Sequence, residues 1–139
     1  MYYHTRSKRK LYDRKRKTDP TCTFCENVAA EDILRETIHS FIVENRTPYD
    51  MWEHHDVLHH LMIIPKRHVH SLVELPEAEL LDAMKLCAEY EADGYNVYAR
   101  ASGSPRRSVF HQHTHLIKIG PRPARAGVYL KKPYLHLSF

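Results

Sequence analysis

The sequence predicts an α+β domain, because several strand-like segments accompany one long helix. Runs of β-branched, aromatic and other apolar residues at 40–45, 60–65, 95–100 and 110–119 favour strands. Residues 76–92 have helical spacing and begin with a proline, which suits the first turn of a helix. At 139 residues, the chain is long enough for one domain with a buried core.

Positive charge is concentrated at the N-terminus. The chain has 21 Lys and Arg against 17 Asp and Glu, a formal net charge of +4. Eight basic residues lie within the first 17 residues: Arg6, Lys8, Arg9, Lys10, Arg14, Lys15, Arg16 and Lys17. We expect residues 1–19 to form a flexible basic arm, which is either a solvated tail or a non-specific hold on nucleic acid phosphates.

We expect the folded domain to occupy residues 20–120, with a C-terminal extension, residues 121–139, packed on it. No apolar run approaches the length of a membrane span, and no signal peptide is visible. The cysteine usage suggests a reducing compartment. These observations predict a cytoplasmic protein with no membrane partner.

The first elements of the domain are short. Residues 28–36 predict a turn of helix followed by a strand, and residues 37–40 form the hairpin turn into the strand at 40–45. Residues 46–57 are polar and aromatic and include several histidines. Segments of this kind more often line a ligand site than fill a core, so we expect a loop beside a site.

The helix at 76–92 carries an apolar stripe, which we expect to face the core. Its members lie at helical spacing and end with one charged residue: Leu80, Met84, Cys87, Ala88 and Glu91. Cys87 is then a buried free thiol. Gly94 suits the left-handed position that ends a helix.

Three histidines alternate with other residues near the end of the domain. His111, His113 and His115 would point out of one face of a strand, about 7 Å from one to the next. Three rings in a row suit a core poorly, because each brings two polar nitrogens. The alternatives are a surface cluster or tag remnant, a site where two of the rings bind one metal ion, or a nucleophile supported by neighbouring imidazoles. The cluster lies inside the chain and is flanked by apolar, strand-like residues, which favours the nucleophile.

Two further cysteines form a Cys-x-x-Cys pair. Cys22 and Cys25 are close enough in sequence to bind one zinc ion, but they supply only half of a site. Two more ligands must come from elsewhere in the chain.

These motifs together resemble the histidine-triad (HIT) superfamily of nucleotide hydrolases and transferases. One mark of that family is His-x-His-x-His preceded by a serine, here residues 108–115. The other is an apolar strand that begins with histidine and runs into Pro-Lys-x-His, here residues 60–68. The resemblance covers about residues 21–119, with the arm and the tail outside it.

The resemblance implies an antiparallel sheet of about five strands with one main helix packed on it. Members of the family often form homodimers, so a homodimer is expected here too. It also implies a two-step reaction at the α-phosphate of a nucleotide or dinucleotide substrate. His113 would be the nucleophile, and His115 and His60 would support it. Ser108 would contact a phosphate oxygen or the leaving group.

Some branches of the family carry a structural zinc ion, and the resemblance supplies the missing ligands here. The implied set is Cys22, Cys25, His68 and His111, with His70 and His59 as neighbouring candidates. Four ligands without an open position make a closed structural site. The alternative is a pair of reduced cysteines beside solvent-facing histidines.

The sequence also departs from the family pattern. The spacers Gln112 and Thr114 are polar where the family is usually apolar, so this face is either less buried or meets a polar partner. Arginine stands at 100 and 107, where the family has asparagine and glutamine on the leaving-group side.

Two arginines would favour a more negative leaving group. Arg107→Gln would then weaken turnover of a dinucleoside polyphosphate more than that of a phosphoramidate. The alternative is that Arg100 and Arg107 sit on a solvated loop. Asn45 and Asp50 are the candidates for holding the ribose.

The leading hypothesis is a hydrolase or nucleotidyltransferase that acts at the α-phosphate through a covalent nucleotidyl-histidine intermediate. Neutral imidazole is a good nucleophile at pH 7, and a covalent intermediate divides one hard displacement into two easier ones. The alternatives are a zinc-stabilised nucleotide or nucleic acid binding module with little turnover, and a metal-dependent hydrolase that uses the alternate histidines as ligands.

Overall fold

The computed structural model describes residues 4–5, 22–123, 127–131 and 134–138. Apart from the short strand β1 (His4–Thr5), the predicted basic arm lies outside the described residues. The predicted C-terminal extension is described in part, as strands β8 (Gly127–Lys131) and β9 (Tyr134–Ser138) of a separate two-stranded sheet. The predicted domain limits stay predictions.

The main sheet is antiparallel throughout. Its longer strands follow the order β2-β3-β5-β7-β6, with β4 beside the start of β5 and β1 beside β4. The strands are β2 (Ile33–Glu36), β3 (Ser40–Glu44), β4 (Met51–Trp52), β5 (His55–Pro65), β6 (Asn96–Ala99) and β7 (Thr114–Pro123). Five strands of four or more residues and one main helix, α3 (Glu77–Ala92), confirm the predicted fold class.

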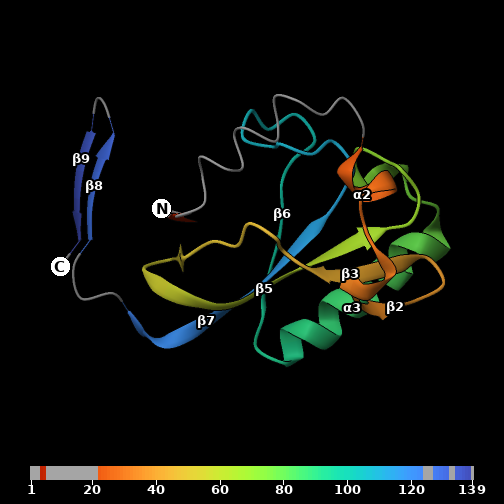
Figure 1. Cartoon of the computed structure of the whole chain (residues 1–139), viewed down its shortest axis with the longest axis horizontal. Coiled ribbons are helices and arrows are strands. Elements are labelled where there is room, and N and C mark those ends of the chain that lie inside the picture. Colours follow the sequence, from red (N-terminus) through yellow and green to blue (C-terminus); the bar gives the residue numbers. More distant parts are fainter. Residues whose placement is uncertain (1–3, 6–21, 124–126, 132–133, 139) are drawn as a thin grey trace.

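The two faces of this sheet bury different side chains, as alternation along a strand requires. On the face covered by α3, Ile42, Ile63 and Leu116 pack with Leu86 of the helix (Figure 1). On the other face, Val43 and Met62 pack with Phe24 of the short helix α2 (Thr23–Glu26). His60 is two residues before Met62 and so shares its face, whereas His115 is one residue before Leu116 and so lies on the opposite face from it. Both histidines are therefore on the α2 face.

The predicted loop at 46–57 is wrong in part, because it contains β4 and the first residues of β5. Trp52 pairs with His55 across a two-residue turn. The turn residues Glu53 and His54 have φ values of 49° and 65°, the left-handed conformation of the tight turn that suits a hairpin. The usual Asn-Gly signal for such a turn is missing, which is why the sequence did not indicate it.

The helix prediction is right in extent and wrong in phase. The buried residues of α3 are Glu79, Ala83, Leu86 and Cys87, whereas Met84 is 50% exposed. This is the predicted i, i+4, i+7, i+8 spacing, shifted by one residue toward the N-terminus. Glu79 is the one charged residue of this buried stripe, and Arg67 Nε donates to its two carboxylate oxygens over 3.0 and 2.9 Å. Gly94 has a φ of 84°, as predicted for the end of the helix.

The predicted strand at 110–119 starts late, because β7 begins at Thr114 and leaves His111 and His113 before it. The ladders on both sides of β7 end at this residue, with Ile63 of β5 and Ala99 of β6 as the last partners. One reason is Pro65, the last residue of β5, which has no N–H to continue the ladder.

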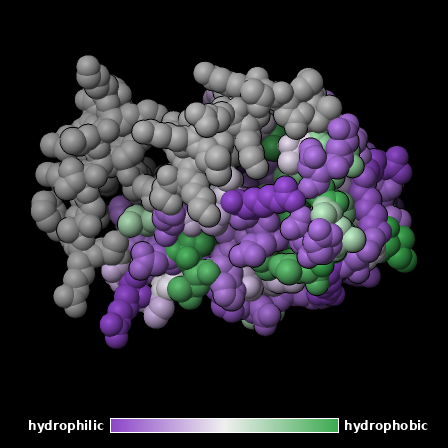
Figure 2. Space-filling model, viewed as in Figure 1, coloured by the Kyte–Doolittle hydropathy of each residue, from purple (hydrophilic) through white to green (hydrophobic). Residues whose placement is uncertain are grey.

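Within the described part of the chain, no helix is long and apolar enough to cross a membrane. Figure 2 shows that the described part of the viewed face is mostly hydrophilic, with apolar side chains in small separate patches.

Candidate active site and metal centre

The site begins with two histidines on neighbouring strands. His60 of β5 and His115 of β7 are diagonal neighbours, because His60 pairs with Ile117 and His115 pairs with Met62. Both rings are buried, and the Nε2 atom of His60 lies 2.9 Å from the Nδ1 atom of His115. The sheet therefore brings together two imidazoles that are 55 residues apart in the sequence.

A backbone amide determines which nitrogen of each ring carries the proton. The Tyr49 N–H donates to Nδ1 of His60 over 3.0 Å, so this nitrogen is an acceptor and Nε2 carries the proton. Nε2 of His60 then donates to Nδ1 of His115. His115 consequently presents an N–H at Nε2, which is a donor suited to a phosphate oxygen. Asn45 lies beside the same pair: its Nδ2 is 3.1 Å from Nε2 of His60, and because both atoms are donors in this tautomer the contact is not a hydrogen bond.

His113 is oriented by its own chain segment. Its Nδ1 donates to the backbone carbonyl of His111 over 2.8 Å, which leaves the lone pair of the neutral ring on Nε2. The ring packs edge-on against His115 at 4.9 Å and against Phe24 at 5.2 Å between centroids. The ring of His111 also packs on Phe24, so all three imidazoles lie on one side, as predicted.

Burial lowers the pKa of His113 to about 4, and the nearby positive charges of Arg107 and Arg100 act in the same direction. The hydrogen bond to the His111 carbonyl opposes this change. The ring is therefore neutral at pH 7 and keeps a lone pair on Nε2. A held, neutral imidazole with one free nitrogen is chemically able to act as a nucleophile.

A second group of side chains surrounds a common point next to the triad. Cys22, Cys25, His68 and His111 place one ligand atom each within 4.8 Å of one another, and this cluster could hold a metal ion. These are the four residues implied by the resemblance. His70 and His59 are outside the cluster: the ring of His70 packs on that of His68, and His59 faces the hydroxyl of Tyr95.

The distances and the donor set both fit a tetrahedral ion. Cys25 Sγ lies 3.2 Å from Nδ1 of His68, and Cys22 Sγ lies 3.4 Å from Nδ1 of His111. Tetrahedral bonds to sulfur and nitrogen place such atoms about 3.6 Å apart. His111 donates from Nε2 to the Pro65 carbonyl over 2.8 Å, which orients Nδ1 toward the cluster as a metal ligand requires.

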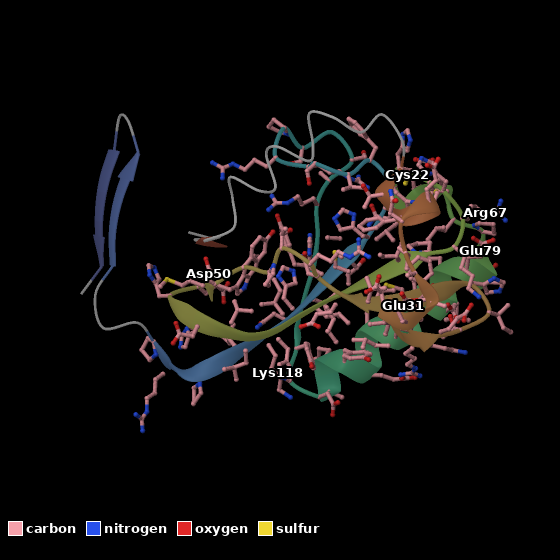
Figure 3. The ribbon with its side chains drawn as sticks, viewed as in Figure 1. Cys22, Glu31, Asp50, Arg67, Glu79 and Lys118 are labelled. Carbon is pink, nitrogen blue, oxygen red and sulfur yellow. The ribbon has the colours of Figure 1, made fainter. Side chains whose placement is uncertain are left out.

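The predicted substrate-binding residues divide into two groups. Asn45 and Arg100 lie beside the triad. Arg100 donates to the hydroxyl of Tyr49 over 3.0 Å and lies over the ring of Tyr98, which stacks on His115. Of the two ribose candidates, Asn45 contacts His60, whereas Asp50 is exposed and lies well apart from Cys22 (Figure 3).

Arg107 and Ser108 lie in the segment that leads to the triad. Ser108 is partly buried, and Arg107 is only 6% exposed, so the solvated-loop alternative is wrong for this arginine. Gln112 and Thr114 are also buried, so the alternative of a less buried face is wrong. The other alternative, a polar partner, is confirmed for Gln112, whose Oε1 accepts a hydrogen bond from Arg107 Nη2 over 2.9 Å.

Phe24, Tyr49 and Tyr98 complete the site and were not predicted as site residues. Phe24 lies between the two cysteines and packs on two imidazoles. Tyr49 is 2% exposed and packs on His60 at 4.6 Å between ring centroids. The aromatic content of the 46–57 segment was the available signal for Tyr49, whereas nothing in the sequence pattern marks Phe24 or Tyr98.

The chain is similar in sequence to known proteins of the family that its motifs resemble. Residues 54–121 match the HIT domain family. The chain is 29% identical over 127 residues to adenosine 5'-monophosphoramidase from Saccharomyces cerevisiae, an alignment that covers 87% of this chain and 75% of the yeast protein.

Two solved structures are similar in fold. A HIT family hydrolase from Clostridium thermocellum superposes with a TM-score of 0.55 at 25% identity, covering 76% of this chain and 98% of the other. A histidine triad nucleotide-binding protein from Candida albicans has a TM-score of 0.55 at 23% identity, covering 82% and 86%. In the sequence of residues 54–121 and in its fold, the chain is thus similar to proteins of the histidine-triad (HIT) superfamily.

Proposed function

We propose that this protein is a nucleotide hydrolase or nucleotidyltransferase that acts at the α-phosphate of a nucleoside phosphate conjugate through a nucleotidyl-His113 intermediate. The observation that carries the proposal is the state of His113: neutral, with Nδ1 held by the His111 carbonyl and the lone pair on Nε2. The names of the yeast and Clostridium proteins, a monophosphoramidase and a hydrolase, support the same class of reaction.

The proposed reaction has two displacements. Nε2 of His113 attacks the α-phosphorus, the bond from phosphorus to the leaving group breaks, and the leaving group departs with its electron pair and takes up a proton. Water or another acceptor then attacks the phosphorus and gives up a proton to solvent, the bond from phosphorus to Nε2 breaks, and His113 leaves as the neutral ring. The substrate class is thus a nucleotide or dinucleotide conjugate.

The other histidines would stabilise charge on the phosphate rather than react. His115 offers its Nε2 proton to a non-bridging oxygen, and His60 and the Tyr49 N–H keep His115 in the tautomer that can do so. Stabilisation of developing charge by fixed donors is usually the largest contribution to catalysis. Arg100 and Ser108 remain our candidates for the leaving-group side, and Asn45 for the ribose.

We also propose that the metal bound by Cys22, Cys25, His68 and His111 is zinc with a structural role. Two thiolates and two imidazoles match the tetrahedral preference of zinc, and four protein ligands leave no open position for a substrate. Zinc would hold His111 in place, and with it the carbonyl that orients His113.

A homodimer and a cytoplasmic location complete the proposal. The exposed apolar residues Leu81 and Met84 of α3 and Val97 of β6 support a partner surface, because α3 packs beside β6. The cytoplasmic location rests on the cysteine usage of the sequence, which suggests a reducing compartment. Binding of nucleic acid by the basic arm stays a prediction, because nearly all of the arm lies outside the described residues.

The test of the proposed reaction is a search for the intermediate. We expect protein incubated with an adenylated substrate carrying label in the adenylate, then quenched in base, to retain the label. His113→Ala should abolish labelling and lower turnover by about 10⁴-fold or more. His70→Ala, which changes a nearby histidine outside the triad, is the control. No label and no turnover with several nucleotides would favour the nucleotide-binding alternative.

A further inference from the structure

The segment that carries His113 lies outside the sheet, yet it is buried. Both ladders of β7 end at Thr114, so residues 109–113 have no strand partner for their backbone groups. Gln112 is 2% exposed. Buried carbonyls and amides without partners cost free energy, so other groups must satisfy this segment and determine its position.

Arg107 satisfies two carbonyls of this segment and the side-chain oxygen of Gln112. Its Nε donates to the Val109 carbonyl over 3.1 Å, and its Nη2 donates to the Phe110 carbonyl and to Gln112 Oε1, each over 2.9 Å. Its Nη1 donates to the His70 carbonyl over 2.6 Å. The last contact crosses from the segment of the nucleophile to the loop that carries the metal ligand His68.

These contacts leave the guanidinium little capacity for a substrate. Arginine has five N–H groups, and the four contacts above occupy four of them. Among the described residues, no carboxylate lies within ion-pair distance of Arg107, although the side chain is buried. A rigid, planar fork of donors suits the joining of several carbonyls better than a lysine does.

We propose that Arg107 is a positioning residue, which holds the His113 segment against the His68–His70 loop and does not contact the leaving group. The inference rests on the proposed function, since it assumes that His113 is the nucleophile. It also changes the role that the sequence suggested for Arg107, because the guanidinium takes the place of strand pairing. The carbonyl of His111, which orients His113, lies in the segment that Arg107 holds.

The kinetic test compares leaving groups. Arg107→Gln and Arg107→Lys are measured with an adenosine phosphoramidate and with a dinucleoside polyphosphate, and exposed Arg106→Gln is the matched control. We expect Arg107→Gln to lower kcat by about 10²-fold for both substrates, the loss typical of a misplaced nucleophile, with KM little changed. Lysine should restore only part of the rate. A loss confined to the polyphosphate would overturn the proposal in favour of direct contact.

A second readout does not depend on activity. The Gln112 amide donates to the Val69 carbonyl over 2.7 Å, so its hydrogen exchange reports how firmly the segment is held. Arg107→Gln should accelerate this exchange at least 10-fold, leave the Leu116 amide in β7 unchanged and leave the metal bound. Unchanged exchange at Gln112 would overturn the proposal. If Arg107→Gln does not fold, the same comparison is made with Arg107→Lys.

The two readouts separate this inference from the proposed function. If the wild-type protein turns over no nucleotide, the proposed function fails, whereas the exchange of Gln112 still decides whether Arg107 holds the segment. If the wild type is active and Arg107→Gln changes neither kcat nor exchange, only the role of Arg107 is overturned.

Discussion

At the scale of single residues, the chemistry depends on the proton positions of three imidazoles. One backbone donor, the Tyr49 N–H, orders His60 and through it His115. One backbone acceptor, the His111 carbonyl, orders His113. Backbone groups cannot exchange donor and acceptor roles, so these tautomers are determined by the fold rather than by the solvent.

The lowered pKa of His113 predicts the pH range of activity. A nucleophile must be neutral, and a pKa of about 4 keeps this ring neutral well below the usual value for histidine. We expect the rate of nucleotidyl-protein formation to be level from pH 7 to about pH 5.5 and to fall only as the pH approaches 4. Single-turnover labelling across this range, with bound metal quantified at each pH, makes the measurement. A decline centred near pH 6.5 with metal still bound would contradict the assignment.

At the scale of elements, the site depends on alternation within the sheet. The period of two places Ile63 and Leu116 on the α3 face and His60 and His115 on the α2 face. The helix thus supplies the core behind the sheet while the opposite face stays available for polar chemistry. The helix contributes stability, whereas β5, β7 and the segment before β7 contribute the imidazoles.

The phase of α3 is tested with two leucines of the same helix. Leu86 is 2% exposed and packs on Ile42, Ile63 and Leu116, whereas Leu81 is 52% exposed. Leu86→Ala should lower the free energy of unfolding by about 2–5 kcal/mol, because it leaves a cavity in the core. Leu81→Ala should change it by about 0.5 kcal/mol or less. Urea unfolding measures both, and equal effects would contradict the observed phase.

At the scale of the whole molecule, the four-residue Cys/His cluster joins parts of the chain that are distant in sequence. Cys22 and His111 are 89 residues apart, and Cys25 and His68 are 43 apart. Closing loops of this length costs conformational entropy in an unfolded chain, which a bound metal offsets in the folded state. The cluster therefore links overall stability to the position of the triad.

Loss of the metal should therefore lower the stability of the fold, because the metal is not proposed to take part in the reaction. A ligand present at 100 times its Kd stabilises the folded state by about 2.7 kcal/mol, which corresponds to about 10 °C in Tm for a chain of this size. Cys22→Ser should lose the metal and lower Tm by this order. Cys87→Ala removes a buried thiol that is not a ligand, so it should keep the metal. Metal analysis and thermal unfolding give the result; full metal content in Cys22→Ser would rule out the cluster.

Several features followed from the sequence because they depend on local spacing. The alternation of three histidines, the Cys-x-x-Cys pair, the hairpin turn at 37–40 and the end of the helix at Gly94 needed no knowledge of distant residues. The resemblance to a known family added His68 and His111 to the cysteines, and the cluster in the structure contains these four residues. The roles of the predicted catalytic residues stay proposals.

Other features depended on contacts between distant segments, and only the tertiary structure decided them. Periodicity gives a helix its stripe but not its phase, which in α3 depends on the packing of Leu86 and Cys87 on the sheet. The start of β7 depended on where its two partners end. Arg107 is buried and donates to four acceptors, a set of contacts that the sequence did not indicate. A sequence names the groups able to react, whereas burial and hydrogen-bond partners, which depend on the whole fold, decide which of them are free to do so.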